Sequence, residues 1–140
     1  MQHFVFVYGT LKEGFPNFSR NYGVRVPGAF QTQERYPFYL CGERFSPCLI
    51  NDPGHGERVV GQVFTVDSPA LAAMDVLERI TEADGYRRVA VDLEAEHATG
   101  FGVLKAFAYL KPLQDVAACD VRVGPITEYT PEHAAHYRPR

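Results

Sequence analysis

The sequence predicts an α+β domain built on a closed or nearly closed β-barrel with a flanking helix. Seven segments combine β-branched and aromatic residues between turn formers, a pattern typical of short strands. One segment alone has a clear helical pattern, and no strand–helix–strand alternation is present, which disfavours a parallel α/β sheet. This number of strands in 140 residues favours a barrel. The predicted strands are residues 3–8, 24–31, 37–41, 47–50, 59–66, 86–93 and 103–110.

The predicted helix covers residues 68–80, "SPALAAMDVLERI". Ser68 is a favourable N-cap, and Pro69 suits the first helical position because its missing N–H would have no helical partner there. Alanine, leucine and methionine, which favour helix, fill most of the following positions.

The connections are expected to be short, because ten prolines and twelve glycines are spread through the chain. Residues 51–57 are predicted to form a loop, and residues 94–100 the hairpin connection between the last two long strands. Short helical turns are expected around residues 17–22 and within 112–119. The segment after Val123 is expected to be irregular.

Composition and charge indicate one globular domain over residues 1–140 and exclude some partners. The formal net charge is −3 and no basic face is evident, so we expect no nucleic-acid partner. No segment approaches the roughly 20 apolar residues that span a bilayer, so we expect no membrane partner. The first predicted strand begins within three residues of the N-terminus, which leaves no room for a signal peptide and favours a cytoplasmic protein.

The cysteines and histidines do not form a recognisable metal or redox pattern. Cys41, Cys48 and Cys119 match no zinc spacing and are predicted to be inert thiols. A cysteine nucleophile at Cys41 or Cys48 stays open as an alternative, since its histidine partner need be adjacent only in space. His133 and His136 lack further ligands nearby, so no metal site is predicted.

The first predicted strand runs into Tyr8-Gly9-Thr10-Leu11 and a loop that contains Gly14, Pro16 and Asn17. A plain turn would explain the glycine alone. A site for an anionic or amide-bearing small molecule would also explain the tyrosine and the hydroxyl residue. A tight turn whose Tyr and Leu fill the core is the alternative.

Glu78 has an unusual place on the predicted helix. At 100° per residue it falls beside Leu71 and Met74, close to the apolar face. A carboxylate in a pocket of low dielectric can serve as a general base or acid. Alternatively, Glu78 reaches solvent or pairs with a nearby arginine, for which the candidates are Arg79, Arg87 and Arg88.

Asp75 lies one turn before Glu78 on the same side of the helix. Two carboxylates in this arrangement could share a proton or a metal, but no third ligand follows at helical spacing. We therefore interpret Asp75 as a structural hydrogen-bond acceptor.

These residues together resemble the γ-glutamylcyclotransferase-like superfamily, and most closely its γ-glutamylamine cyclotransferase, AIG2-like branch. The resemblance rests on "YGTLK" with the glycine, proline and asparagine that follow it, and on "DVLE" at residues 75–78. It continues through "YPFYLCGE", "GERVVGQVFTVD" and "GYRRVAVDL" and covers nearly the whole chain. It implies a mixed, barrel-like sheet flanked by a few helices, with a pocket at one end.

The resemblance also implies an enzyme that releases 5-oxoproline from γ-glutamyl compounds without a cofactor or metal. Tyr8, Gly9, Thr10 and Leu11 match its substrate loop, and Glu78 matches its catalytic carboxylate. Tyr86 matches a substrate-binding tyrosine that follows the helix, although the intervening "ERITEADGY" is longer than is typical of the family.

The sequence therefore predicts a γ-glutamyl cyclotransferase with a small γ-glutamyl amine or γ-glutamyl amino acid as substrate and Glu78 as general acid/base. A noncatalytic small-molecule binding domain and a cysteine-dependent amide hydrolase are the alternatives. The sequence does not identify the amine that is released, and it does not give the oligomeric state. The main hypothesis requires the loop at residues 8–11 and Glu78 to face the same pocket.

Overall fold

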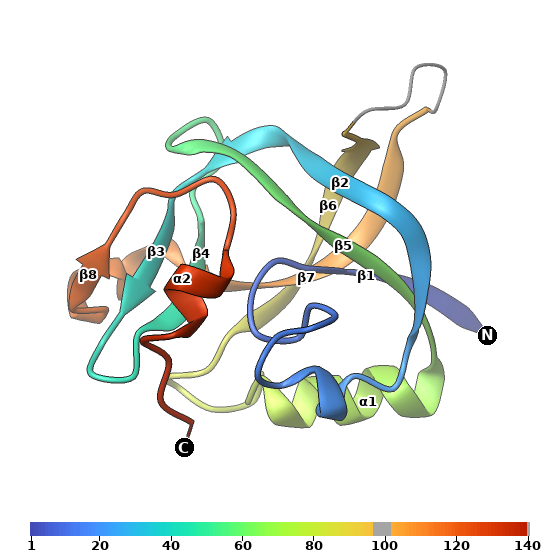
Figure 1. Ribbon diagram of the computed structural model, residues 1–140, viewed down its shortest axis with the longest axis horizontal. Helices are drawn as coiled ribbons and strands as arrows, with labels where there is room; N and C mark the ends of the chain where they lie inside the picture. Colours follow the sequence, from blue (N-terminus) through green and yellow to red (C-terminus); the bar gives the residue numbers. More distant parts are fainter. Residues whose placement is uncertain (97–101, 140) are drawn as a thin grey trace.

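The computed structural model describes residues 1–96 and 102–139, and its centre is a closed β-barrel (Figure 1). Among the described residues, five strands follow one another around the barrel, and a parallel pairing of Val5 with Phe107 closes it. The chain forms this barrel from β1 (Gln2–Val7), β5 (Glu57–Asp67), β2 (Val24–Tyr36), β6 (Arg87–Ala95) and β7 (Leu104–Pro112), in that spatial order.

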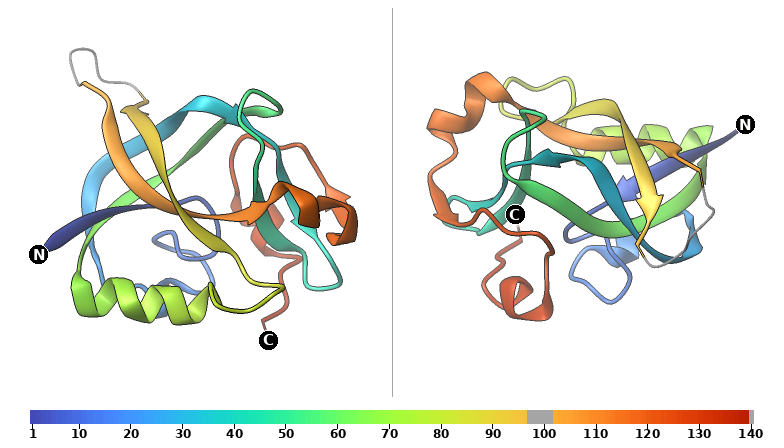
Figure 2. Two further views of the ribbon diagram at one scale, coloured as in Figure 1. Left: turned by 180° about the vertical axis from the view of Figure 1, so that it is seen from behind. Right: turned by 90° about the horizontal axis from the view of Figure 1, so that it is seen from above.

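Three shorter strands extend the sheet from β7 on one side of the barrel, as both views of Figure 2 show. They are β4 (Ser46–Asn51), β3 (Phe38–Cys41) and β8 (Val121–Val123). The β4–β7 and β1–β7 pairs are parallel and the others antiparallel, so the sheet is mixed. The predicted α+β class with a mixed, barrel-like sheet is confirmed.

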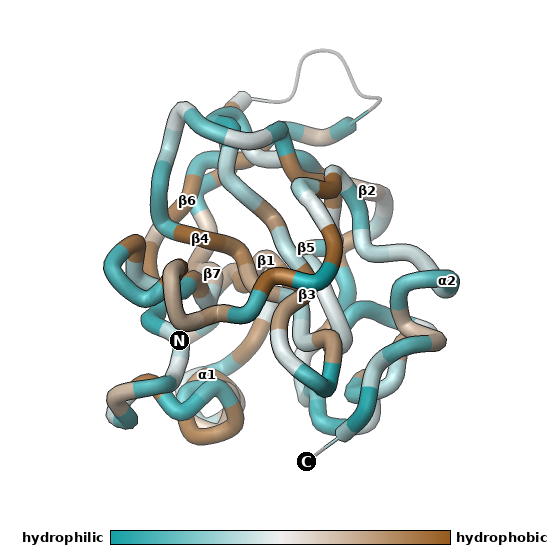
Figure 3. The backbone as a smooth tube through the Cα atoms, turned by 90° about the vertical axis from the view of Figure 1, so that its left-hand side faces the viewer, coloured by the Kyte–Doolittle hydropathy of each residue, from teal (hydrophilic) through white to brown (hydrophobic). Residues whose placement is uncertain are grey.

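Alternate side chains of β1 pack into two different hydrophobic clusters. Phe6 and Tyr8 belong to the larger cluster inside the barrel, whereas Val5 and Val7 belong to the cluster between the barrel and the main helix. In Figure 3 the hydrophobic stretches lie along strands such as β4, while the connections around them are mostly hydrophilic. Tyr8 is thus the last residue of the barrel core before the chain enters the following loop.

The main helix, α1 (Ser68–Leu77), packs against β1 and β5 and begins and ends differently from the prediction. The N-cap is Asp67, not Ser68, because the carboxylate of Asp67 accepts the Ala70 N–H at 2.8 Å. The helix was expected to reach residue 80 and instead ends at Leu77.

The early end of α1 is a Schellman motif in which a nonglycine residue takes the left-handed position. Arg79 has φ +57°, its N–H bonds the Val76 carbonyl at 3.1 Å, and the Ile80 N–H bonds the Asp75 carbonyl at 3.2 Å. No glycine marks this stop, so the sequence did not predict it. Glu78 is consequently the C-cap of α1 and not an interior helical residue.

The 3-10 helices η1 (Phe18–Arg20) and η2 (Leu113–Ala118) lie where short helical turns are predicted. The segment after Val123, predicted to be irregular, contains α2 (Pro131–Ala134) and an isolated bridge from Val60 to Glu128. Strand β8 ends at Val123 and also escaped prediction.

Strand β2 extends five residues beyond the predicted end at Gln31, to Tyr36, and the second of its two register shifts against β5 lies in this extension. Of the predicted 94–100 hairpin, residues 97–100 lie outside the described residues. The strands that it would join, β6 and β7, are antiparallel neighbours. No helix within the described ranges is long and apolar enough to cross a membrane.

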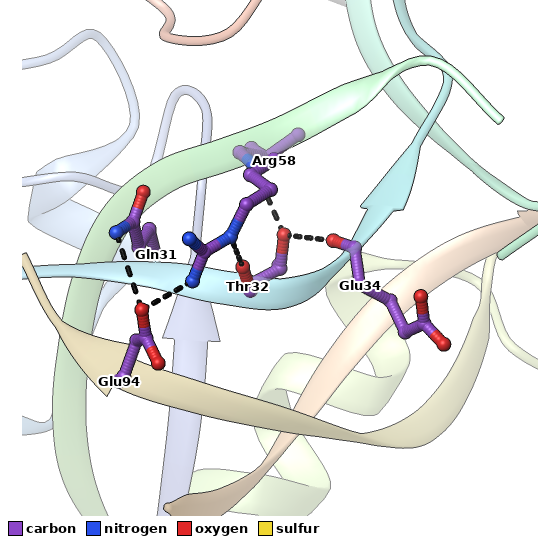
Figure 4. Close-up of polar contacts among 6 residues, drawn as sticks. Gln31, Thr32, Glu34, Arg58 and Glu94 are labelled. Atoms are coloured by element: carbon purple, nitrogen blue, oxygen red, sulfur yellow. Dashed lines mark hydrogen bonds and ion pairs between the residues drawn. The ribbon is translucent and has the colours of Figure 1, made fainter. Parts of the chain in front are cut away.

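A polar network centred on Thr32 fastens β2 to β5 and β6 (Figure 4). The fully buried Thr32 hydroxyl accepts the Val59 N–H at 3.0 Å and donates to the Glu34 carbonyl at 2.6 Å. Arg58 donates to the Thr32 carbonyl at 2.9 Å and pairs with Glu94. This hydrogen-bonded pair with Arg58 lowers the pKa of Glu94. We call these residues the Thr32 network.

Candidate active site

A pocket of about 280 Å³ lies at one end of the barrel, where the loop after β1, the end of α1 and the C-terminal segment gather (Figure 1). Its volume is near the lower end of the range typical for small-molecule sites. All six residues singled out from the sequence line it, namely Tyr8, Gly9, Thr10, Leu11, Glu78 and Tyr86. The two segments that carry them share one cavity, and the chemical roles of the residues remain predictions.

The loop after β1 is folded around Asn17. The Asn17 N–H bonds the Thr10 carbonyl at 2.8 Å, and its side-chain amide donates to the Thr10 hydroxyl at 2.9 Å. A turn closed by the Lys12 N–H and the Gly9 carbonyl, at 3.1 Å, lies within the same loop. Because one residue holds both the backbone and the side chain of Thr10, the hydroxyl has a fixed position on the pocket wall.

The close packing of a neighbouring strand requires a glycine at position 9. A Cβ atom at Gly9 would lie 2.6 Å from Cγ of Pro47 in β4, far closer than van der Waals contact allows. The sequence interpretation was that the missing side chain lets the backbone approach a ligand. The structure adds that it lets Pro47, which also lines the pocket, pack against the loop.

The same loop carries backbone donors without protein acceptors. Within residues 1–96 and 102–139, no hydrogen bond engages the N–H of Gly9, Thr10 or Leu11. Gly9 and Leu11 are buried residues, and a buried N–H without an acceptor costs free energy. These donors are therefore suited to an anionic or carbonyl oxygen of a bound molecule.

Glu78 also lines the pocket, and backbone hydrogen bonds fix its place in the chain. Its N–H bonds the Met74 carbonyl at 2.9 Å, and its own carbonyl accepts the Tyr86 N–H at 3.0 Å. The chain between Glu78 and Tyr86 folds tightly on itself, since a Cβ at Gly85 would lie 1.8 Å from the Arg79 carbonyl oxygen. The segment between Glu78 and Tyr86 thus forms a closed loop that returns Tyr86 to the pocket.

The three arginines weighed as partners of Glu78 make other contacts. Arg79 pairs with Asp84 at 2.9 Å, and Arg88 pairs with Asp75 at 2.6 Å. Arg87 donates to backbone carbonyls of the segment between Glu78 and β6.

Three tyrosines form an aromatic wall whose hydroxyls bond within the protein. Tyr8 donates to the Tyr109 carbonyl at 2.6 Å, Tyr86 to the Pro47 carbonyl at 2.7 Å, and Tyr109 to the Asp75 carboxylate at 2.7 Å. Burial raises the pKa of each of these three phenols above its ordinary value. The tyrosines are therefore fixed, neutral wall residues and are unsuited to the role of general base.

Asp75 is a structural hydrogen-bond acceptor, as the sequence analysis predicted. One carboxylate oxygen accepts from Tyr109 and the other from Arg88. It positions Tyr109, a pocket residue that the sequence did not reveal because "FAYL" in β7 has the pattern of an ordinary core strand.

None of the cysteines lines the pocket. Cys41 and Cys48 are buried, Cys119 is half-buried, and all three are free thiols. A contact with Cys119 lowers the pKa of Cys48, but contact with Cys41 and burial outweigh it and raise the value to about 11. A protonated, buried thiol is a poor nucleophile, which disfavours the cysteine-dependent alternative. Within the described ranges, no three His, Cys, Asp or Glu side chains are grouped as metal ligands.

Several pocket residues had no signal in the sequence. One arginine ends η1, another lies in the β3–β4 turn, and the others come from β4, β7 and the segment that was expected to be irregular. They are Arg20, Arg44, Pro47, Tyr109, Tyr137 and Pro139. Their common property is that only the tertiary fold brings them to the cavity.

The fold and the pocket together define a mixed-barrel domain with a pocket at one end. The chain belongs to the γ-glutamyl cyclotransferase, AIG2-like family, whose model matches residues 5–128. The family resemblance found in the sequence is thereby confirmed.

The chain is similar to named relatives over most of its length. It is 39% identical over 113 residues to γ-glutamylaminecyclotransferase B of Danio rerio, covering 76% of this chain and 58% of that protein. It is 38% identical over 114 residues to γ-glutamylaminecyclotransferase of Bos taurus, covering 75% and 63% respectively. The chain thus spans less than two thirds of the length of these two relatives.

A crystal structure of an AIG2-like protein from Mus musculus has the same fold. The two structures superpose with a TM-score of 0.82 at 26% sequence identity. The superposition covers 99% of this chain and 97% of the mouse chain, so it includes the C-terminal segment beyond the family match.

Proposed function

We propose that this chain is a γ-glutamyl cyclotransferase that acts on γ-glutamyl amines or γ-glutamyl amino acids, with Glu78 as general acid/base. The observation that carries the proposal is that Glu78 and the loop at residues 8–11 line the same cavity. The names of the two curated relatives agree with this activity.

The reaction closes a five-membered lactam. The α-ammonium of the γ-glutamyl group has a pKa of about 7.7–8.0 in a free chain and must lose a proton before its nitrogen can attack. Glu78 accepts this proton. The nitrogen then bonds to the γ-carbonyl carbon, whose oxygen becomes negatively charged.

Collapse of the tetrahedral intermediate breaks the bond to the leaving amine. Glu78 returns the proton to that amine, then takes the second proton from the ring nitrogen and passes it to the departing amine. The products are therefore 5-oxoproline and an ammonium, and Glu78 is again a carboxylate. General acid–base catalysis of this kind contributes about 10²–10⁴-fold to the rate. Because the nucleophile is part of the substrate, holding the glutamyl chain in a bent conformation supplies much of the remaining acceleration.

The loop after β1 suits the negative charge of the glutamyl half. The unbonded N–H groups of Gly9, Thr10 and Leu11 can donate to the α-carboxylate or to the oxygen on which charge develops. The Thr10 hydroxyl, already fixed by Asn17, can add a further contact. Tyr8 and Tyr86, which both line the pocket, would restrict the conformation of the glutamyl chain.

The activity is tested by incubating the protein with a panel of γ-glutamyl compounds and measuring 5-oxoproline, glutamate and free amine together. We expect one 5-oxoproline for each amine released and no glutamate. Release of glutamate would identify a hydrolase instead, and ligand-dependent melting shifts without any product would identify a binding domain. The free thiols are compatible with the cytoplasmic setting that we propose for this activity.

A further inference from the structure

The pocket contains more positive charge than the glutamyl half of a substrate requires. Among the described residues, the charged side chains of its lining belong to one glutamate, Glu78, and to three arginines, Arg20, Arg44 and Arg79. The described part of the chain gives Arg79 an ion pair with Asp84 and gives none to the other two arginines. Two guanidinium groups on the wall are thus available to a bound anion.

The two arginines lie on segments that meet the same part of the C-terminal segment. Arg20 ends η1, and its N–H bonds the Asn17 carbonyl at 2.9 Å, while the Asn17 amide donates to the Tyr137 hydroxyl at 3.1 Å. Arg44 lies in the β3–β4 turn, and its carbonyl accepts the Arg138 N–H at 3.0 Å. Tyr137 and its neighbour therefore connect the two arginine-bearing segments at one side of the pocket.

Two contacts hold the C-terminal segment in place as part of the pocket wall. The buried Lys12 ammonium donates to the Tyr129 carbonyl, and the Phe45 and His136 rings stack with their centroids 5.3 Å apart. Residues 129–139 lie beyond the range matched by the family model. This part of the pocket is thus built by a segment that the family match does not describe.

We propose that Arg20, Arg44 and Tyr137 form the subsite for the leaving amine and select an amine that carries a carboxylate. This proposal rests on the proposed cyclotransferase function. A guanidinium binds a carboxylate through two parallel, charge-assisted hydrogen bonds, and the Tyr137 hydroxyl can add a third donor. A leaving amine that ends in a second ammonium would meet two like charges, and an alkyl amine would leave both guanidinium groups without an anion.

Matched pairs of substrates test the subsite. γ-Glutamyl derivatives of glycine, β-alanine and 4-aminobutyrate are compared with those of ethylamine, propylamine and butylamine, so that each pair differs by a carboxylate in place of a methyl group. We expect the wild-type kcat/KM for 5-oxoproline release to favour the carboxylate member of the best pair by about 10–100-fold, the effect of charged hydrogen bonds. Arg44→Gln and Arg20→Gln should each reduce this preference, with little change for the alkylamine member.

The control is Arg122→Gln, which removes a positive charge from β8 outside the pocket and should leave the preference unchanged. Release of 5-oxoproline from both members of every pair at equal kcat/KM would overturn the subsite while supporting the proposed function. No 5-oxoproline from any compound would overturn both. Equal losses on both members in Arg44→Gln and Arg20→Gln, with unchanged melting temperatures, would assign the arginines to the glutamyl half and also overturn the subsite.

Discussion

The pocket and the Thr32 network are both polar regions of the same barrel, but their polar groups are satisfied differently. In the network, the Thr32 hydroxyl and the Arg58 guanidinium bond to other protein groups across three strands (Figure 4). At the pocket, the N–H groups of residues 9–11 and the guanidinium of Arg44 have no protein partner among the described residues. Polar groups that are satisfied internally stabilise the fold, whereas these pocket groups are available to a ligand. The two regions should therefore respond oppositely to mutation.

The largest expected effect is at Glu78. Glu78→Gln keeps the size and hydrogen-bonding capacity of the side chain but removes the proton acceptor, so we expect kcat for 5-oxoproline release to fall by about 10²–10⁴-fold. The melting temperature, measured by circular dichroism, should change little. Glu82→Gln is the matched control, because Glu82 is exposed in the same loop and does not line the pocket. Wild-type turnover in Glu78→Gln would refute the assigned role.

The next effect concerns the packing behind the loop after β1. In Gly9→Ala the new Cβ would overlap the Pro47 ring, so the loop or β4 must move. We expect a loss of about 1–3 kcal/mol in unfolding free energy, typical of overpacking, and at least tenfold lower kcat/KM because the loop donors shift.

Urea denaturation and the 5-oxoproline assay measure these two quantities for Gly9→Ala. Gly102→Ala is the control, since a Cβ there would meet nothing within 4 Å. If Gly9→Ala matched the control in both measurements, close packing against Pro47 would not explain the glycine.

The Thr32 network should show the reverse pattern, a loss of stability without a loss of chemistry. Thr32→Val removes the hydroxyl that accepts the buried Val59 N–H, so we expect an unfolding free energy lower by about 1–3 kcal/mol. Thr65→Val, which removes a long hydrogen bond of 3.4 Å in the same sheet, should cost less. Urea denaturation measures both. A changed kcat per folded molecule in Thr32→Val would show that the two regions are coupled.

The same contrast explains what the sequence could predict. Strand patterns, the helix start near Ser68 and the loop at residues 8–11 depend on neighbours in sequence, and they locate the barrel and one half of the pocket. The helical period also placed Glu78 beside Leu71 and Met74, although in the structure Glu78 is the C-cap of α1. The strand patterns, the helix start and the loop could be predicted because the partners of each residue lie within a few positions.

The end of α1 escaped prediction although its hydrogen bonds are local, because Arg79 takes a left-handed conformation that no glycine signals. The other features that escaped prediction depend on distant partners. Arg20, Arg44 and Tyr137 are separated in sequence and meet only through hydrogen bonds made after folding. The extension of β2 beyond Gln31 likewise requires a register shift against β5, which lies between Gln31 and Arg35.

The smallest expected effect is at Lys12. This residue lies in the loop that forms the pocket, but its side chain is hydrogen-bonded within the protein, like the Thr32 network. Its ammonium donates to the Tyr129 carbonyl and lies 4.3 Å from the centroid of the Phe15 ring. Burial lowers the pKa of Lys12 from 10.5 to about 8, although nearby Glu128 opposes this shift. Above pH 8 the unfolded chain therefore holds more protons than the folded one, and the free energy of unfolding rises as the pH increases toward 10.5.

We therefore expect the unfolding free energy of the wild type to rise, relative to that of Lys12→Met, by up to about 2 kcal/mol between pH 7 and 9.5. Urea denaturation of both proteins across this range measures the difference, and the contributions of tyrosines common to both cancel. Lys105→Met is the control, since Lys105 is an exposed lysine paired with Asp92 and should keep the pH dependence of the wild type. Parallel curves for the wild type and Lys12→Met would mean that Lys12 keeps an ordinary pKa. The ammonium would then be solvated like a surface charge, and its bond to Tyr129 could not be what holds the C-terminal segment against the pocket.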